Sequence, residues 1–159
     1  MALRTLSRLL MAAALVTASA AAAPQRSGGS AEILNNDSIV SMTAAKVDRG
    51  LLVNKIDTTR NAFDVSVAGL ISLHRGKVHQ DVIRMMIRMA GDPKLGTNRK
   101  SEALDNQGVI SLVTAKVPKG VILAKIEHSP AKFDTSADGL VELTRSKVPS
   151  DVIKAMLAK

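Results

Sequence analysis

Residues 63–89 read FDVSVAGLISLHRGKVHQDVIRMMIRM, and residues 133–159 read FDTSADGLVELTRSKVPSDVIKAMLAK. Both stretches belong to a longer repeat, in which residues 34–89 align without gaps to residues 104–159, with 22 of 56 positions identical. Each copy also repeats within itself at an offset of 31 residues, so the chain holds four related half-units. A self-similar sequence of this kind predicts one small structural unit that is built several times.

Six positions are apolar in all four half-units, and we expect all of them to be buried. They are Ile39, Leu70, Val109, Leu140; Met42, Leu73, Leu112, Leu143; Val47, Val78, Val117, Val148; Leu51, Val82, Val121, Val152; Leu52, Ile83, Ile122, Ile153; and Ile56, Ile87, Ile126, Leu157. Their spacings of three and four residues on either side of a turn predict two short helices per half-unit. Such short helices are unstable alone and need a neighbouring hairpin.

The joint between paired half-units has the same sequence signature in both copies. Ser66 and Ser136 stand where a helix N-cap belongs, and Asp64 and Asp134 place negative charge at the same helix start. The preceding residues, Phe63 and Phe133, are the two aromatic residues of the chain. We expect each to fill the core of its own copy.

The N-terminus has the pattern of a secretory signal peptide over residues 1–22. Arg4 and Arg8 precede the apolar run 9–16, and small residues follow. The alternative is an uncleaved membrane anchor, but the run 9–23 is shorter than the roughly 20 residues that span a bilayer. The sequence therefore predicts export, to the periplasm or beyond the cell.

These observations predict an all-α fold of two tandem four-helix modules, each a pair of short helical hairpins, after the signal peptide. The predicted divisions are a signal peptide (1–22), a flexible leader (23–33), a first module (34–90), a linker (91–103) and a second module (104–159). The linker is rich in Gly, Pro and charge. Whether the two modules pack together stays open.

Composition narrows the function. The chain has no Cys, which excludes disulfides, thiolate metal sites and a thiol nucleophile. With two Phe and no Trp or Tyr, it also lacks aromatic platforms for stacking bases. Without the signal peptide, 20 Lys and Arg face 14 Asp and Glu, a basic balance that is compatible with a polyanionic partner.

The strings Phe-Asp-x-Ser-x-x-Gly-Leu and Lys-Val-x-x-Asp-Val-Ile-x-x-Met resemble an uncharacterised short helical repeat of exported bacterial proteins. The match is closest over residues 121–126 and 148–157. There is a fainter likeness to SHOCT-type helical domains, which are linked to oligomer formation. The resemblance implies a bacterial envelope protein and no activity. The chain departs from the repeat where Gly usually precedes the turn Val, because a lysine stands there in all four half-units: Lys46, Lys77, Lys116 and Lys147.

Two interpretations of these lysines stay open. They form a basic surface for an anionic polymer or lipid headgroup, or they are cations near helix C-termini, where each stabilises the helix by about 0.3–1 kcal/mol. The position suits the second interpretation in every half-unit.

Other groups invite a chemical interpretation: the acids Asp81 and Asp151, the histidines His74, His79 and His128, and the methionines Met85, Met86, Met89 and Met156. For the acids, a place in the first helical turn is favoured over catalysis. The histidines lack the spacing of a helical metal pair, which favours surface positions. For the methionines, helix-core packing is favoured over copper binding.

We therefore expect an exported, non-catalytic helical-repeat protein, without metal or cofactor, that serves as a protein-interaction or structural module of the cell envelope. We expect it to bind another protein, whose identity the sequence does not give, and oligomer formation stays open. The alternative is electrostatic binding of a polyanion such as nucleic acid, an acidic envelope polymer or an anionic lipid surface. A hydrolase of unknown type comes third, since no nucleophile elbow, phosphate loop or zinc-ligand spacing is present.

Overall fold

The structure is a computed structural model that describes residues 32–92, 94 and 102–159. The predicted signal peptide (1–22) lies outside the described residues, as do most of the leader and most of the linker. Contacts group the described residues into a single compact unit. No helix in the described ranges is both long enough and apolar enough to cross a bilayer.

The prediction of a mainly helical protein is confirmed over the described ranges. These hold eight helices of 8 to 11 residues, so each has two to three turns, as the apolar spacing predicts. They are α1 (Asn36–Ala44), α2 (Arg49–Thr58), α3 (Val67–Arg75), α4 (Gln80–Ala90), α5 (Asn106–Thr114), α6 (Lys119–His128), α7 (Ala137–Arg145) and α8 (Ser150–Leu157).

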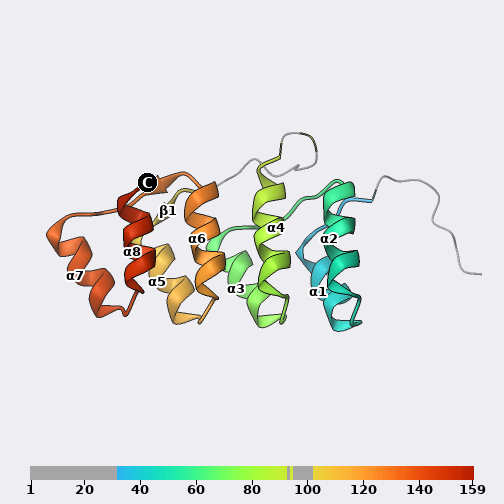
Figure 1. Cartoon of the computed structure of the whole chain (residues 1–159), viewed down its shortest axis with the longest axis horizontal. Helices are drawn as coiled ribbons and strands as arrows, with labels where there is room; N and C mark the ends of the chain where they lie inside the picture. The colour runs from blue at the N-terminus through green and yellow to red at the C-terminus, as the bar shows by residue number, and fades with distance from the viewer. Residues whose placement is uncertain (1–31, 93, 95–101) are drawn as a thin grey trace, which may run out of the picture. The chain divides into compact units, whose positions relative to one another are not determined.

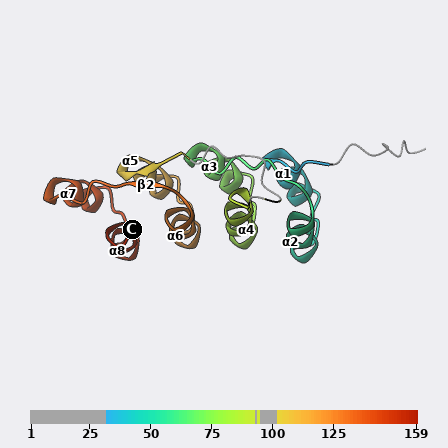
Figure 2. The ribbon, with the colours of Figure 1, turned by 90° about the horizontal axis from the view of Figure 1, so that it is seen from above.

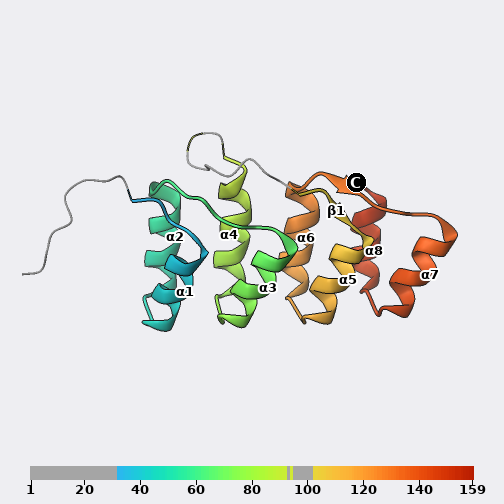
Figure 3. The same cartoon turned by 180° about the vertical axis from the view of Figure 1, so that it is seen from behind.

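Consecutive helices pair into four hairpins: hairpin 1 (α1 and α2), hairpin 2 (α3 and α4), hairpin 3 (α5 and α6) and hairpin 4 (α7 and α8). The odd-numbered helices contact one another in order along the chain, and the even-numbered helices do the same. Seen from above in Figure 2, the odd-numbered helices form one layer and the even-numbered helices the other, and Figures 1 and 3 show the two layers from opposite sides. This arrangement is typical of an α-solenoid, in which each repeat packs on its neighbours.

The two sequence copies pack against each other, which the sequence left open. Helix α4 of the first copy contacts α6 of the second, and α3 contacts α5. Hairpins 2 and 3 therefore meet across the predicted linker as closely as hairpins within one copy do. The predicted linker, 91–103, lies between α4 and the second copy, but the two copies do not form separate cores.

A short parallel pairing holds the entry of the second copy in place. Strand β1 (Leu104–Asp105) pairs with strand β2 (Ala131–Lys132), which lies between hairpins 3 and 4. The first copy has the corresponding single bridge between Leu34 and Asn61. In each copy, the segment before the first helix is thus fixed to the connection between its two hairpins.

The Phe-Asp-x-Ser-x-x-Gly motif is structural. The Ser66 side chain accepts a hydrogen bond from the Gly69 backbone N–H (3.1 Å), which confirms the predicted N-cap. Asn36 reaches across from α1, donating to the Asp64 carbonyl (2.8 Å) and accepting from the Asp64 N–H (3.0 Å). A Cβ at Gly69 would lie 2.3 Å from the Asp64 carbonyl oxygen, so only glycine lets the helix approach this closely.

The second copy repeats this arrangement. Ser136 caps α7, and Asn106 makes the same two bonds to the backbone of Asp134. A Cβ at Gly139 would again meet a backbone carbonyl, that of Asp134, at 2.4 Å. The identical residues in the two signature stretches are therefore explained by local geometry.

Most of the expected apolar columns are buried, and the exceptions lie at the two ends of the row. Leu51 of hairpin 1 is 65% exposed, and Leu157 of hairpin 4 is 53% exposed, so the expectation that they are buried is wrong. Their counterparts in the other hairpins are all buried. The physical reason is that, among the described residues, no hairpin packs on the outer side of hairpin 1 or of hairpin 4.

The expectation for the two phenylalanines holds in the first copy only. Phe63 is fully buried, at the boundary between hairpins 1 and 2. Phe133, in the last copy, is partly buried and packs on the margin of the core. Within the described ranges no hairpin packs beyond hairpin 4, which explains the difference.

Candidate anion-binding edge

Each hairpin turns through a lysine in the left-handed backbone conformation. Lys46, Lys77, Lys116 and Lys147 have φ angles of 58–59°, and they are the non-glycine residues with positive φ among the described ranges. At each turn the lysine takes up the conformation that glycine usually supplies.

The hydrogen bonds identify the turn. In hairpin 1 the Lys46 N–H donates to the Thr43 carbonyl (3.0 Å) and the Val47 N–H donates to the Met42 carbonyl (3.0 Å). This pair of bonds, with an apolar residue after the left-handed one, is the Schellman motif at a helix C-terminus. The other three hairpins make the same two bonds, each between 2.9 and 3.1 Å. The buried turn valines of hairpins 2 to 4 are the apolar part of the motif.

The helix dipole alone does not explain a lysine at this position. A side chain other than glycine in the left-handed region costs roughly 1–2 kcal/mol. A cation near the helix C-terminus gains about 0.3–1 kcal/mol. The gain therefore offsets part of the strain at most, and glycine would serve the turn as well. Strained conformations that recur in a structure point to a role for the side chain itself.

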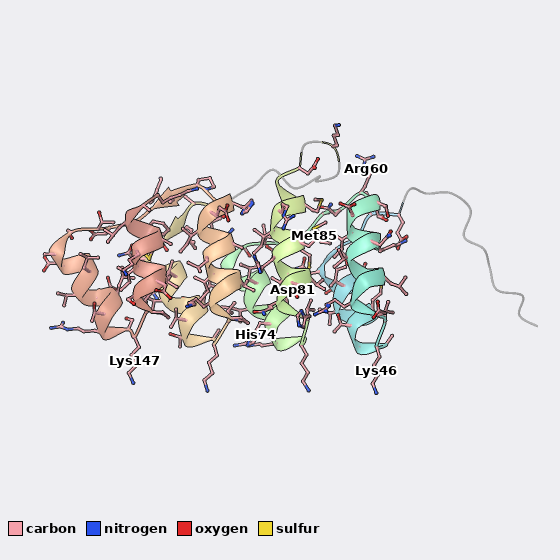
Figure 4. The ribbon with its side chains drawn as sticks, in the orientation of Figure 1. Lys46, Arg60, His74, Asp81, Met85 and Lys147 are labelled. Carbon is pink, nitrogen blue, oxygen red and sulfur yellow. The ribbon has the colours of Figure 1, made fainter. Side chains whose placement is uncertain are left out.

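All four lysine side chains are exposed, and none makes an ion pair with a described residue. The four turns lie along one edge of the unit, the lower edge in Figure 1. In Figure 4, Lys46 and Lys147 extend from this edge at the two ends of the row. Because packed helices lie about 8–10 Å apart, neighbouring lysines follow one another at roughly that spacing.

The surroundings of the lysines are also basic. We define the turn edge as residues 45–49, 75–81, 115–119 and 145–151, which together contain eight Lys and Arg and three Asp. The other described residues contain nine Lys and Arg and eleven Asp and Glu. The positive charge of the described unit is thus concentrated at one edge.

The three acids of the turn edge already have partners. Asp48 caps α2, accepting from the Gly50 N–H at 2.8 Å. Asp81 lies 3.4 Å from Arg49, and Asp151 lies 2.6 Å from the Lys119 ammonium group. The hydrogen bond and charge of Lys119 hold the pKa of Asp151 below its usual value. These pairs join hairpin 1 to hairpin 2 and hairpin 3 to hairpin 4, and they leave the four turn lysines free to meet an external anion.

Asp81 and Asp151 occupy the first turns of α4 and α8, as predicted. Asp134 also has a structural role, since hydrogen bonds from Ser136 hold its pKa below the usual value. The structure thus brings no two of these acids together in one site.

The histidines and methionines are dispersed. His79 forms the N-cap of α4, with its ring nitrogen 3.3 Å from the Asp81 N–H, and His128 contacts the Ala124 carbonyl at 3.0 Å. Met86 and Met156 are buried, as the core interpretation predicts. Within the described ranges, no three His, Cys, Asp or Glu residues cluster as metal ligands would.

A shallow depression of about 460 Å³ lies on hairpins 1 and 2, between the N-terminal parts of α1 and α3. Asn36 and Asp64 line it, but these residues already bind each other in the structural clamp described above. The depression therefore adds no chemistry beyond the fold.

Sequence reasoning missed a buried lysine between the two copies. Lys125 on α6 is 1% exposed, and burial lowers its pKa, with opposing contributions from the nearby charges of Glu102 and Asp64. The alignment contained a signal, because the corresponding residues of the even-numbered half-units are Met86 and Met156. An apolar counterpart indicates a position that faces a neighbouring hairpin.

Comparison of the chain with protein families, with curated proteins and with solved structures found no match to any of them.

Proposed function

We propose that the chain is an exported, non-catalytic helical-repeat protein that serves as a protein-interaction or structural module of the cell envelope. The observation that carries the proposal is the continuous packing of four hairpins through the same apolar columns. In solenoids, such columns form the core, and the outer surfaces are available to contact partners. The signal peptide pattern and the resemblance to a repeat of exported bacterial proteins support the location.

Export is tested by expressing the tagged full-length chain in a Gram-negative host and fractionating the cells. We expect the protein in the periplasm or medium, shortened by about 20–23 residues because a signal peptidase cuts after the small-residue run. Full-length protein held in the inner membrane would contradict the proposal.

Binding is tested by cross-linking the exported chain in the envelope and comparing it with variants of two different surfaces. One variant replaces the four turn lysines with Gln, and the other replaces Leu51 and Leu157 with Glu. We expect a specific cross-linked product that one variant loses and the other keeps, because the two surfaces lie on different parts of the unit. Products identical for the wild type and both variants would argue against either surface as the contact.

The turn edge favours a second candidate function, electrostatic binding of a polyanion. Its support is the recurrence, at all four turns, of an exposed lysine in a strained conformation that forms no ion pair with the described part of the chain. Lysines spaced along one edge suit a linear polymer of negative charges, because each can neutralise a separate anionic group. Displaced counterions then supply much of the binding free energy.

Salt dependence provides the test. Binding of the chain to heparin or to single-stranded nucleic acid is measured as a function of salt, for the wild type and for the variant with all four turn lysines changed to Gln. Loss of four anion contacts should reduce the slope of log K against log salt by about 3–4.

A matched control removes the same charge from exposed residues outside the turn edge. The residues changed to Gln are Arg60, Arg88, Lys94 and Lys132. We expect the control to bind with nearly the wild-type slope. Equal losses from both variants would show that total charge, and not the turn edge, governs the binding.

A further inference from the structure

The two ends of the hairpin row expose apolar residues that every internal joint buries. Leu51 is 65% exposed, whereas Val82, Val121 and Val152 in the same column are fully buried. Since only the first hairpin exposes this column, the column faces the preceding hairpin. The exposed side of hairpin 1 therefore corresponds to the side on which each of the other hairpins contacts the hairpin before it.

The opposite end exposes a different set of columns. Leu157 is 53% exposed, whereas Ile56, Ile87 and Ile126 are buried. Val141 is 46% exposed, and its counterpart Val40 contacts the turn of the next hairpin, as its side chain would lie 3.0 Å from a Cβ at Gly76. These columns face the following hairpin. On hairpin 4, Val141 lines a depression of about 250 Å³ together with Leu140, Thr144 and Arg145.

The 70-residue repeat makes the two ends complementary. Hairpin 4 is the sequence counterpart of hairpin 2, and hairpin 1 is the counterpart of hairpin 3. The exposed side of hairpin 4 and the exposed side of hairpin 1 are thus the two halves of the joint that hairpins 2 and 3 form within the chain. That joint is established in the structure by the contacts of α4 with α6 and of α3 with α5.

The charges at the ends resemble those at the internal joint. At that joint, Lys125 of hairpin 3 is buried, and the nearby charges of Glu102 and of Asp64, which lies between hairpins 1 and 2, oppose the lowering of its pKa. The corresponding residues are Lys55 on hairpin 1, Glu32 before it and Asp134 beside hairpin 4. Lys55 already pairs with Glu32 within the chain. A hairpin 1 placed on a hairpin 4 would add Asp134 of the neighbouring chain to this pair, so the charges are compatible with the occupant that the apolar residues indicate.

We infer that the chain associates head to tail with a second copy of itself, hairpin 4 of one copy packing on hairpin 1 of the next through the joint already used between hairpins 2 and 3. The inference rests on the proposed role as a structural or interaction module, and it names the partner. An interface of this kind is heterologous, because two different surfaces meet, so it can continue beyond a dimer.

The test compares two single variants with the wild type by sedimentation velocity over a range of concentrations. All proteins are expressed from the full-length sequence and then purified. Leu51→Glu blocks the side of hairpin 1, and Leu157→Glu blocks the side of hairpin 4. Both residues are exposed in the isolated chain, so both variants should keep the far-UV circular dichroism of the wild type. We expect the wild-type mass to rise with concentration and each variant alone to stay monomeric, with its dissociation constant raised at least tenfold.

The decisive experiment mixes the two variants. The Leu51→Glu copy retains an intact hairpin 4 and the Leu157→Glu copy retains an intact hairpin 1, so the mixture should form a dimer of one each and nothing larger. Ala68→Glu is the control, because Ala68 is exposed on α3 and its counterpart in the second copy is already acidic, Asp138. This control should associate like the wild type.

Three outcomes would overturn the inference: a wild type that is monomeric at all concentrations, a single variant that dimerises alone, or a mixture that stays monomeric. Association that is equal in all variants would do the same, since it would locate the contact elsewhere. None of these results bears on export or on the cross-linking of other envelope components, so failure here is distinguishable from failure of the proposed function.

Discussion

Replacing the turn lysines with glycine separates what the turn requires from what the lysine contributes. At each turn the lysine has φ near 59°, so glycine relieves roughly 1–2 kcal/mol of backbone strain. The same change removes about 0.3–1 kcal/mol of favourable interaction with the helix dipole. It also gives the unfolded chain more freedom, which is worth about 0.4–1 kcal/mol. These effects nearly cancel.

We therefore expect each of Lys46→Gly, Lys77→Gly, Lys116→Gly and Lys147→Gly to change the free energy of unfolding by less than about 1 kcal/mol. Valine at the same positions should behave differently, because a β-branched residue is poorly accommodated at positive φ. Each valine variant should lose at least about 1 kcal/mol, since the strain grows and the charge is lost.

The assay is urea unfolding followed by circular dichroism, with the wild type, the four glycine variants and the four valine variants side by side. Glycine variants that lose more than about 2 kcal/mol, or valine variants as stable as the glycine variants, would refute the left-handed turns. If glycine is tolerated at all four turns together while heparin binding is lost, the lysines are explained by what they bind and not by the fold.

Three further changes test the packing. Gly69→Ala should lower the free energy of unfolding by at least about 1–3 kcal/mol in a urea titration, because its Cβ would lie 2.3 Å from the Asp64 carbonyl. Lys125→Met should raise stability by about 1 kcal/mol or more at neutral pH, since it removes a buried charge. Because burial lowers the pKa of Lys125, its pKa is lower in the folded chain than in the unfolded chain. The free energy of unfolding of the wild type should therefore increase as the pH rises from the first value to the second, and the Met variant should lack this increase. The fragments 33–90 and 103–159 should each be helical by circular dichroism but melt well below the intact chain, because separation exposes the joint between α4 and α6.

The sequence predicts the local structure well because local interactions determine it. Apolar spacing locates the short helices, and Ser66 and Ser136 cap the helices that they were expected to cap. The spacing within the signature stretches also predicts helix, turn and helix, which agrees with α3 and α4 and with α7 and α8. Each of these features depends on residues within about four positions of one another, so a single half-unit contains the information.

The errors arise where neighbours along the row matter. An alignment treats all half-units and both copies as equivalent, so it predicts burial for Leu51, Leu157 and Phe133, which lie at the ends of the row or beside them. Lys125 is buried because hairpin 2 packs on α6, and the only sign of this in the alignment was its apolar counterparts Met86 and Met156. The left-handed lysines escaped prediction because lysine has no preference for that conformation. The only sign of this conformation in the sequence is that a lysine stands where the repeat that the chain resembles usually has glycine.

The two proposed surfaces depend on one geometry. The joint between hairpins sets the spacing from each turn lysine to the next, including the step from hairpin 2 to hairpin 3 across the two copies. A second chain added through the same joint would place its Lys46 one step beyond Lys147 of the first, and the row of lysines would continue across the boundary between chains. A polyanion long enough to contact both chains would then hold them together, since it binds the assembled form with more contacts than either chain alone. By linkage, assembly would strengthen binding to the polymer to the same extent. The repetition of one lysine at every turn is what such coupling requires, because a row with gaps at the chain boundary would give a long polymer no advantage over a short one.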